Sequence, residues 1–230
     1  MDHEQAVSLI ARTLLFAGLD PTALAVIATE GHERTYKRHA PIFHQGEHGD
    51  SFFVVVEGAV KVFVTSAQGE EMVLTTVRSP DTLGDVALFD EGPRSASAEA
   101  LEPVRLLAFA PSTVLGLAER DPRIYESLLR ASGALLRRLT IQAADLVFLD
   151  LEGRIAKLLA ESAQARGEDE GGSLVLDLGF TQGDLASMVG GSRQSVNQIL
   201  RSLEGRGFLE IQPHTVVVKD LGALRHRAGL

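Results

Sequence analysis

The sequence predicts an α+β protein built from an N-terminal, jelly-roll-like β-roll, a long helix and a C-terminal winged helix-turn-helix. Three features of the chain lead to this fold class. Short β-rich runs fill residues 34–110, and a continuous helical pattern follows from Pro122 to about Leu149. Two further helical patterns meet at a pair of glycines within residues 181–203. We therefore expect three regions, at 1–120, 121–150 and 151–230.

Composition restricts the class of protein. The chain has 230 residues, of which 45% are hydrophobic, a formal net charge of −9 and no cysteine. Without cysteine, disulfides, thiolate-bound metals, iron–sulfur clusters and a cysteine nucleophile are excluded. No apolar run approaches the roughly 18 residues of a membrane span, and the N-terminus lacks the pattern of a signal peptide. We therefore expect a cytoplasmic protein that does not bind membranes.

The β-rich region is divided by turn residues into many short strands. Runs such as SFFVVVEG and AVKVFVTS alternate with glycines at turn positions, namely Gly46, Gly49, Gly58, Gly69 and Gly84. This spacing predicts a compact antiparallel barrel or roll. Residues 1–30 precede it and have a helical pattern, with Pro21 at the start of a second helix.

One segment of this region, GDVALFDEGPRSASAEA at 84–100, suits a sugar phosphate. Backbone N–H groups at the start of a short helix favour an anion. The planar fork of Arg94 can pair with phosphate oxygens, and Ser95 can donate a further hydrogen bond. Asp85 can accept a hydrogen bond from a ribose hydroxyl. A structural salt bridge between Arg94 and Asp85 is an equal alternative, because ion pairs commonly have no function.

The long helix carries a leucine stripe. One heptad position holds Leu128, Leu135, Gln142 and Leu149, and the other holds Ser132, Leu139 and Leu146, with Leu129 and Leu136 beside them. Such a stripe usually packs on a partner helix. Alternatively, it covers the roll of its own subunit. We favour a homodimer, because helix-turn-helix readers generally pair to match two half-sites on DNA.

The segment 181–203 predicts a helix-turn-helix. Thr181 is the expected N-cap of the first helix, Gly190 and Gly191 form the turn, and Ser192 caps the second helix. Polar side chains on one face of the second helix suit base-edge readout in the major groove. The expected DNA-binding residues are Thr181, Ser192, Arg193, Gln194, Ser195, Asn197, Gln198 and Arg201. A simple helical hairpin would share the apolar pattern.

The surroundings of this segment have their own signals. Residues 208–220 alternate like two strands and predict the wing, whereas the polar stretch 165–172 predicts a solvated loop. Within 190–219 the charge turns positive, through Arg193, Arg201, Arg206 and Lys219 against Glu204 and Glu210. A small basic tip on an acidic body suits site-specific contact with double-stranded DNA.

No catalytic constellation is found in the sequence. The seven histidines have no metal-ligand spacing with nearby carboxylates, and neither a P-loop nor a nucleophile elbow is present. We predict that the chain is not an enzyme and binds no metal.

Three motifs together resemble the CRP/FNR family of transcription regulators, in its cyclic-AMP receptor protein branch. They are GDVALFDEGPRSA at 84–96, ADLVFLDLEGRIAKLL at 144–159 and MVGGSRQSVNQILRSLEGRGFLEI at 188–211. The resemblance implies a cyclic-nucleotide-binding β-roll, a dimerisation helix, and reader domains that a ligand reorients through a hinge at about 146–150. It also implies cAMP as effector, operator DNA as partner, and RNA polymerase as a protein partner.

The resemblance also implies roles for single residues. The nucleotide would be held by Gly84, Asp85, Val86, Ala87, Arg94, Ser95, Leu139 and Thr140. Arg94 and Ser95 match the family's pattern for the cyclic phosphate. Asp85 stands where cAMP binders of the family usually have glutamate, and Leu139 stands where the purine-facing pair usually begins with threonine. These departures leave open a degenerate sensor that needs no ligand or answers cyclic di-GMP or cyclic GMP.

In the reader, Arg193 matches the arginine with which the family reads guanine. Gln194 replaces a glutamate that commonly contacts cytosine, and Gln198 replaces a second arginine. Because glutamine prefers adenine, we expect an operator with a retained guanine and altered neighbouring bases. A sensory scaffold whose output is protein interaction is a third interpretation, which the base-facing Arg193 disfavours.

Overall fold

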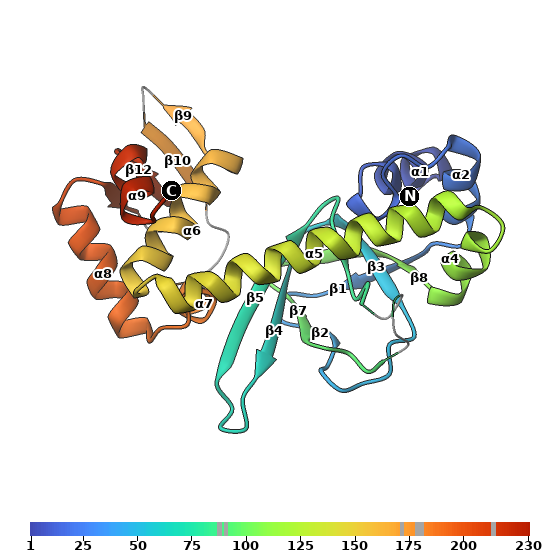
Figure 1. The fold of residues 1–230 in the computed structure, drawn as a ribbon, viewed down its shortest axis with the longest axis horizontal. Helices are drawn as coiled ribbons and strands as arrows, with labels where there is room; N and C mark the ends of the chain where they lie inside the picture. Colours follow the sequence, from blue (N-terminus) through green and yellow to red (C-terminus); the bar gives the residue numbers. More distant parts are fainter. Residues whose placement is uncertain (87–88, 90–91, 171–172, 178–181, 213–214) are drawn as a thin grey trace. The chain divides into compact units, whose positions relative to one another are not determined.

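The computed structural model describes residues 1–86, 89, 92–170, 173–177, 182–212 and 215–230. The chain forms two compact units, Met1–Arg137 and Arg138–Leu230, and the division falls inside the long helix α5, Pro122–Phe148 (Figure 1). The predicted α+β fold class is confirmed: a β-roll with helices makes up the first unit, and a winged helix-turn-helix lies in the second.

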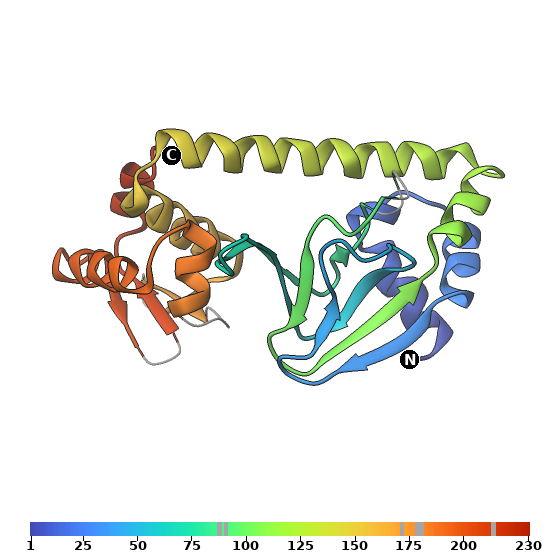
Figure 2. The same ribbon diagram turned by 90° about the horizontal axis from the view of Figure 1, so that it is seen from below.

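The β-roll consists of two four-stranded antiparallel sheets (Figure 2). One sheet has the order β1-β8-β3-β6, from His32–Tyr36, Val104–Phe109, Phe52–Glu57 and Thr82–Leu83. The other has the order β2-β7-β4-β5, from Pro41–Phe43, Ser97–Ala100, Ala59–Thr65 and Glu71–Arg78. Inward side chains of both sheets, including Phe53, Val60 and Leu106, share one buried cluster. The roll thus holds the loop after β6 and the loop before β7 on a rigid frame.

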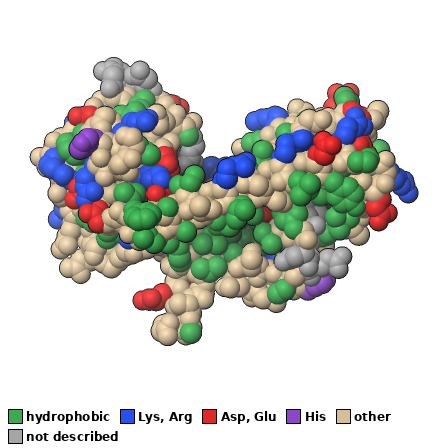
Figure 3. All heavy atoms as spheres, in the orientation of Figure 1, with side chains coloured by type: hydrophobic (Ala, Val, Ile, Leu, Met, Phe, Trp, Pro, Cys, Tyr) green, Lys and Arg blue, Asp and Glu red, His purple; other side chains and the backbone are tan. Residues whose placement is uncertain are grey.

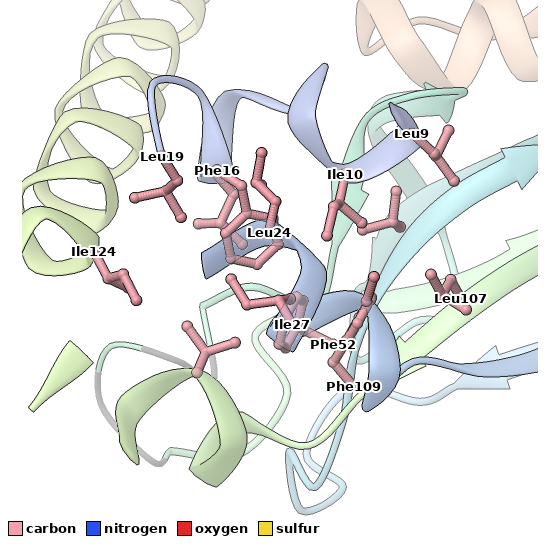
Figure 4. Packing of buried hydrophobic residues seen from close by; sticks show 14 of the residues in the cluster. Leu9, Ile10, Phe16, Leu19, Leu24, Ile27, Phe52, Leu107, Phe109 and Ile124 are labelled. Carbon is pink, nitrogen blue, oxygen red and sulfur yellow. The ribbon is translucent and has the colours of Figure 1, made fainter. Parts of the chain in front are cut away.

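Helices pack on the β1-β8-β3-β6 sheet through a second apolar cluster. They are α1 (His3–Ala11), the 3-10 turn Leu14–Phe16, α2 (Pro21–Thr29), α4 (Pro111–Ala118) and the first turns of α5. Figure 4 shows the aromatic centre of this cluster, where Phe52 lies 5.2 Å from Phe109 and 6.1 Å from Phe16 between ring centroids. Burial of rings this large supplies much of the core's stability.

Side chains at the helix starts define where these helices begin. Asp2 caps α1 in a capping box with Gln5, and Asp20 caps α2 by accepting from the Ala23 amide at 2.9 Å. Asp20 also pairs with Arg123 in the first turn of α5. Hydrogen bonds from the Thr22 hydroxyl, the Ala23 amide and Arg123, in decreasing order, lower the pKa of Asp20. The cap of α2 is therefore tied to the start of the long helix.

The helix α5 buries one face in its own unit and exposes another. Ile124, Leu128 and Ala131 lie in the helix–sheet cluster. Leu128 was predicted to face a partner helix, but it is buried in its own unit. Instead, Leu129 is 72% exposed and Leu136 is 66% exposed. With Leu139 and Leu146, which are also exposed, they form an apolar stripe along α5. The exposed stripe therefore begins one residue later than the predicted seam, with Leu129 and Leu136 in place of Leu128 and Leu135, and coincides with it at Leu139 and Leu146. Hydrophobic side chains are visible at the surface over α5 in Figure 3.

The second unit joins helices to a small antiparallel sheet. Its helices after α5 are α6 (Leu151–Arg166), α7 (Gln182–Val189), α8 (Arg193–Gly205) and α9 (Leu221–Arg227). The sheet has the order β11-β12-β10-β9, from Leu209–Ile211, Thr215–Val218, Ser173–Asp177 and Glu168–Glu170. Ile155, Leu159, Val196 and Leu203 are central to the core. The hairpin β11–β12 is the predicted wing. Pro213 and His214 lie outside the described residues.

Two features of this unit differ from the prediction. The polar stretch 165–172 was expected to be a solvated loop, but it contains β9, whose backbone pairs with β10 at the edge of the sheet. Backbone pairing at an edge does not require apolar side chains. The helix α9 was not predicted at all. Its Leu224 is fully buried, and it packs on α6.

Arg227 of α9 joins a charged cluster at the start of α6, and this cluster makes stability depend on pH. Its guanidinium donates to Asp150 at 2.6 and 2.7 Å and to Glu152 at 2.8 Å. Hydrogen bonds from Arg227 and the Gly153 amide lower the pKa of Asp150, and those from Arg206 and Arg227 lower the pKa of Glu152. Both carboxylates therefore keep their charge in the folded state at a lower pH than in the unfolded chain.

We expect Arg227→Met to destabilise the second unit by up to about 1 kcal/mol at pH 6, as for exposed ion pairs. Because both pKa values are lowered by folding, this stabilisation is complete above the ordinary carboxyl values of about 4 and is lost as the pH falls through the folded values. Urea unfolding at several pH values measures it, with Arg225→Met as the control on the same helix. A difference between wild type and Arg227→Met that stays constant down to pH 3 contradicts the expectation.

No described helix is both long and apolar enough to cross a bilayer.

Candidate nucleotide site and DNA-recognition surface

Backbone pairing fixes Arg94 beside the loop that follows β2. The Arg94 amide donates to Glu47 O at 2.8 Å, and Gly46 N donates to Arg94 O at 2.9 Å. A β-bridge between His48 and Pro93 continues this pairing. The position of Arg94 is therefore set by main-chain hydrogen bonds on both of its sides, before its side chain makes any contact.

The side chain of Arg94 is buried, with only 5% of the residue exposed. Nη1 donates to Gly84 O at 3.1 Å, and Nη2 donates to Ser51 O at 2.5 Å. The guanidinium lies 4.2 Å above the ring centroid of Phe43. Nε is buried and has no hydrogen-bond partner among the described atoms. A buried cation that retains an unused donor is suited to an anionic ligand.

The sequence left open a salt bridge between Arg94 and Asp85. In the described residues, the carboxylate that pairs with Arg94 is that of Asp50. Arg94 lies 4.0 Å from Asp50, whose side chain is 78% exposed, while Asp85 accepts a hydrogen bond from the Thr82 hydroxyl at 3.2 Å. Burial lowers the pKa of Arg94, and the charges of Asp50 and Glu47 act in the opposite direction. The nearby exposed carboxylate therefore compensates the buried charge only in part.

Glycine is required at position 84. Its φ of +73° lies in the left-handed region, and a Cβ there would come within 2.6 Å of Nη1 of Arg94. This close approach allows the carbonyl of Gly84 to accept from the guanidinium. The loop after β6 and the segment before β7, ten residues apart in the chain, are thereby joined at Arg94.

The structure joins two members of the predicted nucleotide-binding set, Gly84 and Arg94. Gly84, Asp85 and Val86 follow β6, and Arg94 and Ser95 precede β7, all in the first unit. Ala87 lies outside the described residues. Leu139 and Thr140 are exposed positions of α5 in the second unit, and their role toward a purine stays a prediction. Two contacts were missed: Phe43 and the carbonyl of Ser51, which nothing in the local sequence connects to Arg94.

The recognition helix α8 has two distinct faces. Val196, Leu200 and Leu203 are buried in the core of the second unit. The opposite face forms a surface hollow lined by Arg193, Gln194, Asn197, Gln198 and Arg201. All five were among the predicted DNA-binding residues. The apolar period of the helix therefore orients these polar side chains outward by burying the other face.

The start of α8 is held by its cap. Ser192 Oγ accepts from the Ser195 amide at 3.1 Å, and the two hydroxyls lie 2.8 Å apart. Gly190 adopts a φ of +65° in the turn before the helix, and a Cβ on Gly191 would lie 2.7 Å from the side chain of Leu151. In the predicted Gly-Gly turn, Gly190 is therefore needed for its backbone conformation, and Gly191 for the close approach of Leu151. Thr181 lies outside the described residues.

The basic tip is narrower than the sequence predicted. Arg206 pairs with Glu152 at 2.5 Å and stacks over Phe208, and Lys219 pairs with Glu210 at 2.6 Å. Within the described part of the chain, neither Arg193 nor Arg201 makes an ion pair. Two of the four basic side chains are therefore neutralised by carboxylates, and Arg193 and Arg201 carry the charge of the exposed face of α8.

Among the described residues, no group of three or more histidines and carboxylates is arranged to hold a metal ion.

Two family models match the chain. Residues 33–121 match the cyclic nucleotide-binding domain, and residues 153–227 match the Crp-like helix-turn-helix domain. Over 220 residues the chain is 34% identical to the CRP-like cAMP-activated global transcriptional regulator of Mycobacterium tuberculosis (strain ATCC 25618 / H37Rv), with 96% of this chain and 98% of that protein covered. It is 30% identical over 214 residues to the cyclic AMP receptor protein of Thermus thermophilus, with 93% and 96% covered.

The fold is also similar to that of a solved regulator. The c-di-GMP responsive global regulator CLP of Xanthomonas campestris has a TM-score of 0.76 at 22% identity, with 86% of this chain and 99% of that chain covered. At this identity the likeness concerns the fold alone. The matched domains, their order and the full-length relatives agree with the β-roll, the long helix and the winged reader described above. The chain belongs to the CRP/FNR family, whose members are DNA-binding transcription regulators and not enzymes.

Proposed function

We propose that the chain is a homodimeric, sequence-specific regulator whose affinity for operator DNA is controlled by a cyclic nucleotide bound at Arg94. The burial of Arg94, which is 5% exposed and lies 4.0 Å from the exposed carboxylate of Asp50, inside the region that matches a cyclic nucleotide-binding domain, is the observation that carries this proposal. cAMP is the first effector to test, because the relatives from M. tuberculosis and T. thermophilus are named for it. We further propose that RNA polymerase is the protein partner of this regulator and that the regulator acts in the cytoplasm.

The chemistry of binding follows from the contacts of Arg94. Both Nη atoms donate to neutral carbonyls in the structure. The ionised phosphate is a stronger acceptor than a carbonyl, and it would meet the guanidinium charge in a site of low exposure. Ser95 would add a hydroxyl donor, with Gly84, Val86 and Ala87 providing backbone around the phosphate. Asp85 would accept from the ribose, and Leu139 and Thr140 would face the purine.

A second candidate is the same regulator with another effector or none. Asp85 has a shorter reach than glutamate, and Leu139 offers no hydrogen bond to an adenine amino group. These two departures from the cAMP-binding pattern leave cyclic di-GMP, cyclic GMP or ligand-independent DNA binding as the second candidate.

Calorimetric titration of the full chain with cAMP, cyclic GMP and cyclic di-GMP tests both candidates. Binding of one nucleotide, together with a change in DNA affinity in its presence, supports the proposal, because only a ligand that prefers one conformation can shift an equilibrium. Sequence-selective DNA binding without any nucleotide binding supports the second candidate. If no duplex from a randomised pool is selected under any of these ligands, both candidates are wrong.

The reader makes a separate prediction about sequence discrimination. We expect Arg193→Ala to reduce the preference for the operator guanine by about 1–3 kcal/mol, or roughly 5- to 150-fold, because a bidentate contact to guanine is lost. Fluorescence anisotropy compares the selected operator with duplexes in which that guanine is replaced. Arg225→Ala, which removes one positive charge from α9, is the control and should leave the preference unchanged. Equal weakening by Arg193→Ala on every duplex would instead indicate a phosphate contact.

A further inference from the structure

The joint between α5 and α6 lies in the second unit and is very short. α5 ends at Phe148 and α6 begins at Leu151, so only Leu149 and Asp150 separate two helices. Apolar packing is sparse there, since Val147 is 75% exposed and Phe148 is 82% exposed. Few residues of α5 and α6 lie close to each other. The angle between the helices therefore depends on a small number of polar contacts.

One ion pair spans this joint. Nζ of Lys157, in the second turn of α6, lies 2.7 Å from both carboxylate oxygens of Asp145, in the last turn of α5. The Lys157 side chain is 12% exposed and the Asp145 side chain 24%. A pair with this little exposure is less screened by salt than a surface pair. Glu161 lies 4.0 Å from the same lysine but on its own helix, so it does not span the joint.

The first turn of α6 also connects the joint to the reader. Arg154 donates from Nη1 to Leu149 O at 2.7 Å and from Nε to Val189 O at 2.8 Å. Val189 is the last residue of α7, directly before the glycine turn that leads to α8. A change in the direction of α6 relative to α5 would therefore be passed to the recognition helix through hydrogen bonds and packed side chains.

We propose that the Asp145–Lys157 ion pair positions α6 against α5 and is required to transmit the effect of the nucleotide to the reader. This inference rests on the proposed function, in which a nucleotide controls DNA affinity. Asp145 and Lys157 are positioning residues and touch neither ligand nor DNA in this scheme. With the pair removed, the sparsely packed joint samples more angles, and a change in α5 is transmitted less completely to α8.

The test is the ratio of DNA affinities with and without a saturating cyclic nucleotide, taken from the titration series above. We expect Asp145→Asn and Lys157→Met each to lower this ratio by about 3- to 10-fold, within the range known for mutations along a coupling path. The charge-swapped double variant Asp145→Lys/Lys157→Asp should restore most of it, because the attraction across the joint returns. Glu161→Gln, on the same helix, should leave the ratio unchanged.

A structural readout keeps the inference independent of the nucleotide. The chain has no cysteine, so Ile141→Cys and Gln164→Cys can carry spin labels on exposed sites of α5 and α6. The distance distribution should be narrow in the wild-type background and in the charge swap, and broad in the single variants. Equal distributions in all variants overturn the inference, as does an unchanged affinity ratio in the single variants. If the wild-type chain itself shows no response to any nucleotide, the proposed function fails, and the label distances alone decide the role of the ion pair.

Discussion

Replacing Arg94 with alanine is expected to weaken cyclic nucleotide binding by roughly 30- to 5,000-fold. Truncating one member of a buried, hydrogen-bonded charge pair costs about 2–5 kcal/mol, because the other charge is left without its partner. Arg94 is 5% exposed, so its contact with the phosphate would form largely out of water in the wild type. Calorimetric titration of the variant with the nucleotide that binds the wild type measures the loss.

The variant must remain folded for this result to be informative. Arg94 also donates to the carbonyls of Gly84 and Ser51, and its removal leaves both acceptors unsatisfied. Thermal unfolding therefore accompanies each titration, and Arg94→Lys provides a second test, since it keeps the charge but loses the planar fork. We expect Arg94→Lys to bind more weakly than the wild type and more tightly than Arg94→Ala.

Arg78→Ala is the matched control for this site. Arg78 lies on β5 of the same roll and pairs with Glu102 at 3.4 Å. Because its guanidinium is already paired with a carboxylate, its removal should leave nucleotide affinity within about twofold. Unchanged affinity in folded Arg94→Ala would show that the guanidinium has only a structural role in the loop.

Introducing lysine at Leu136 is expected to raise the dissociation constant of the proposed dimer by roughly 30- to 1,000-fold, which corresponds to about 2–4 kcal/mol for a central interface position. The Leu136 side chain is 66% exposed in the single chain and lies in the α5 stripe with Leu129, Leu139 and Leu146. A charge in an apolar helix–helix seam loses its hydration without gaining a partner. Sedimentation over a dilution series measures the change.

Ile141→Lys tests whether the face of α5, rather than any added charge, decides this result. Ile141 is 54% exposed and lies on the side of the helix away from Leu136 and Leu139. It should sediment like the wild type. Equal dissociation of both variants, or of neither, would contradict the assignment of the dimer to this stripe.

Much of the fold could be predicted from short stretches of the sequence. The helix start at Pro21, the cap Ser192 and the turn at Gly190 depend on residues within a few positions of each other, so local chemistry determines them. The apolar period of α8 likewise determined which side chains face outward. For the same reason, the exposed residues of the recognition surface could be identified from the helical pattern alone.

The tertiary structure decided which charged and apolar side chains meet across long separations. Arg94 pairs with Asp50 and stacks on Phe43 rather than pairing with Asp85, Leu128 is buried in its own unit, and Lys157 reaches Asp145 across a helix joint. A heptad pattern gives two adjacent rows of leucines, and only the packing of α5 on its own sheet determines which row remains exposed. Ion pairs between residues that are distant in the chain depend on how the elements pack in space. The order of charged residues in the sequence does not determine that packing, so these pairs could not be predicted from it.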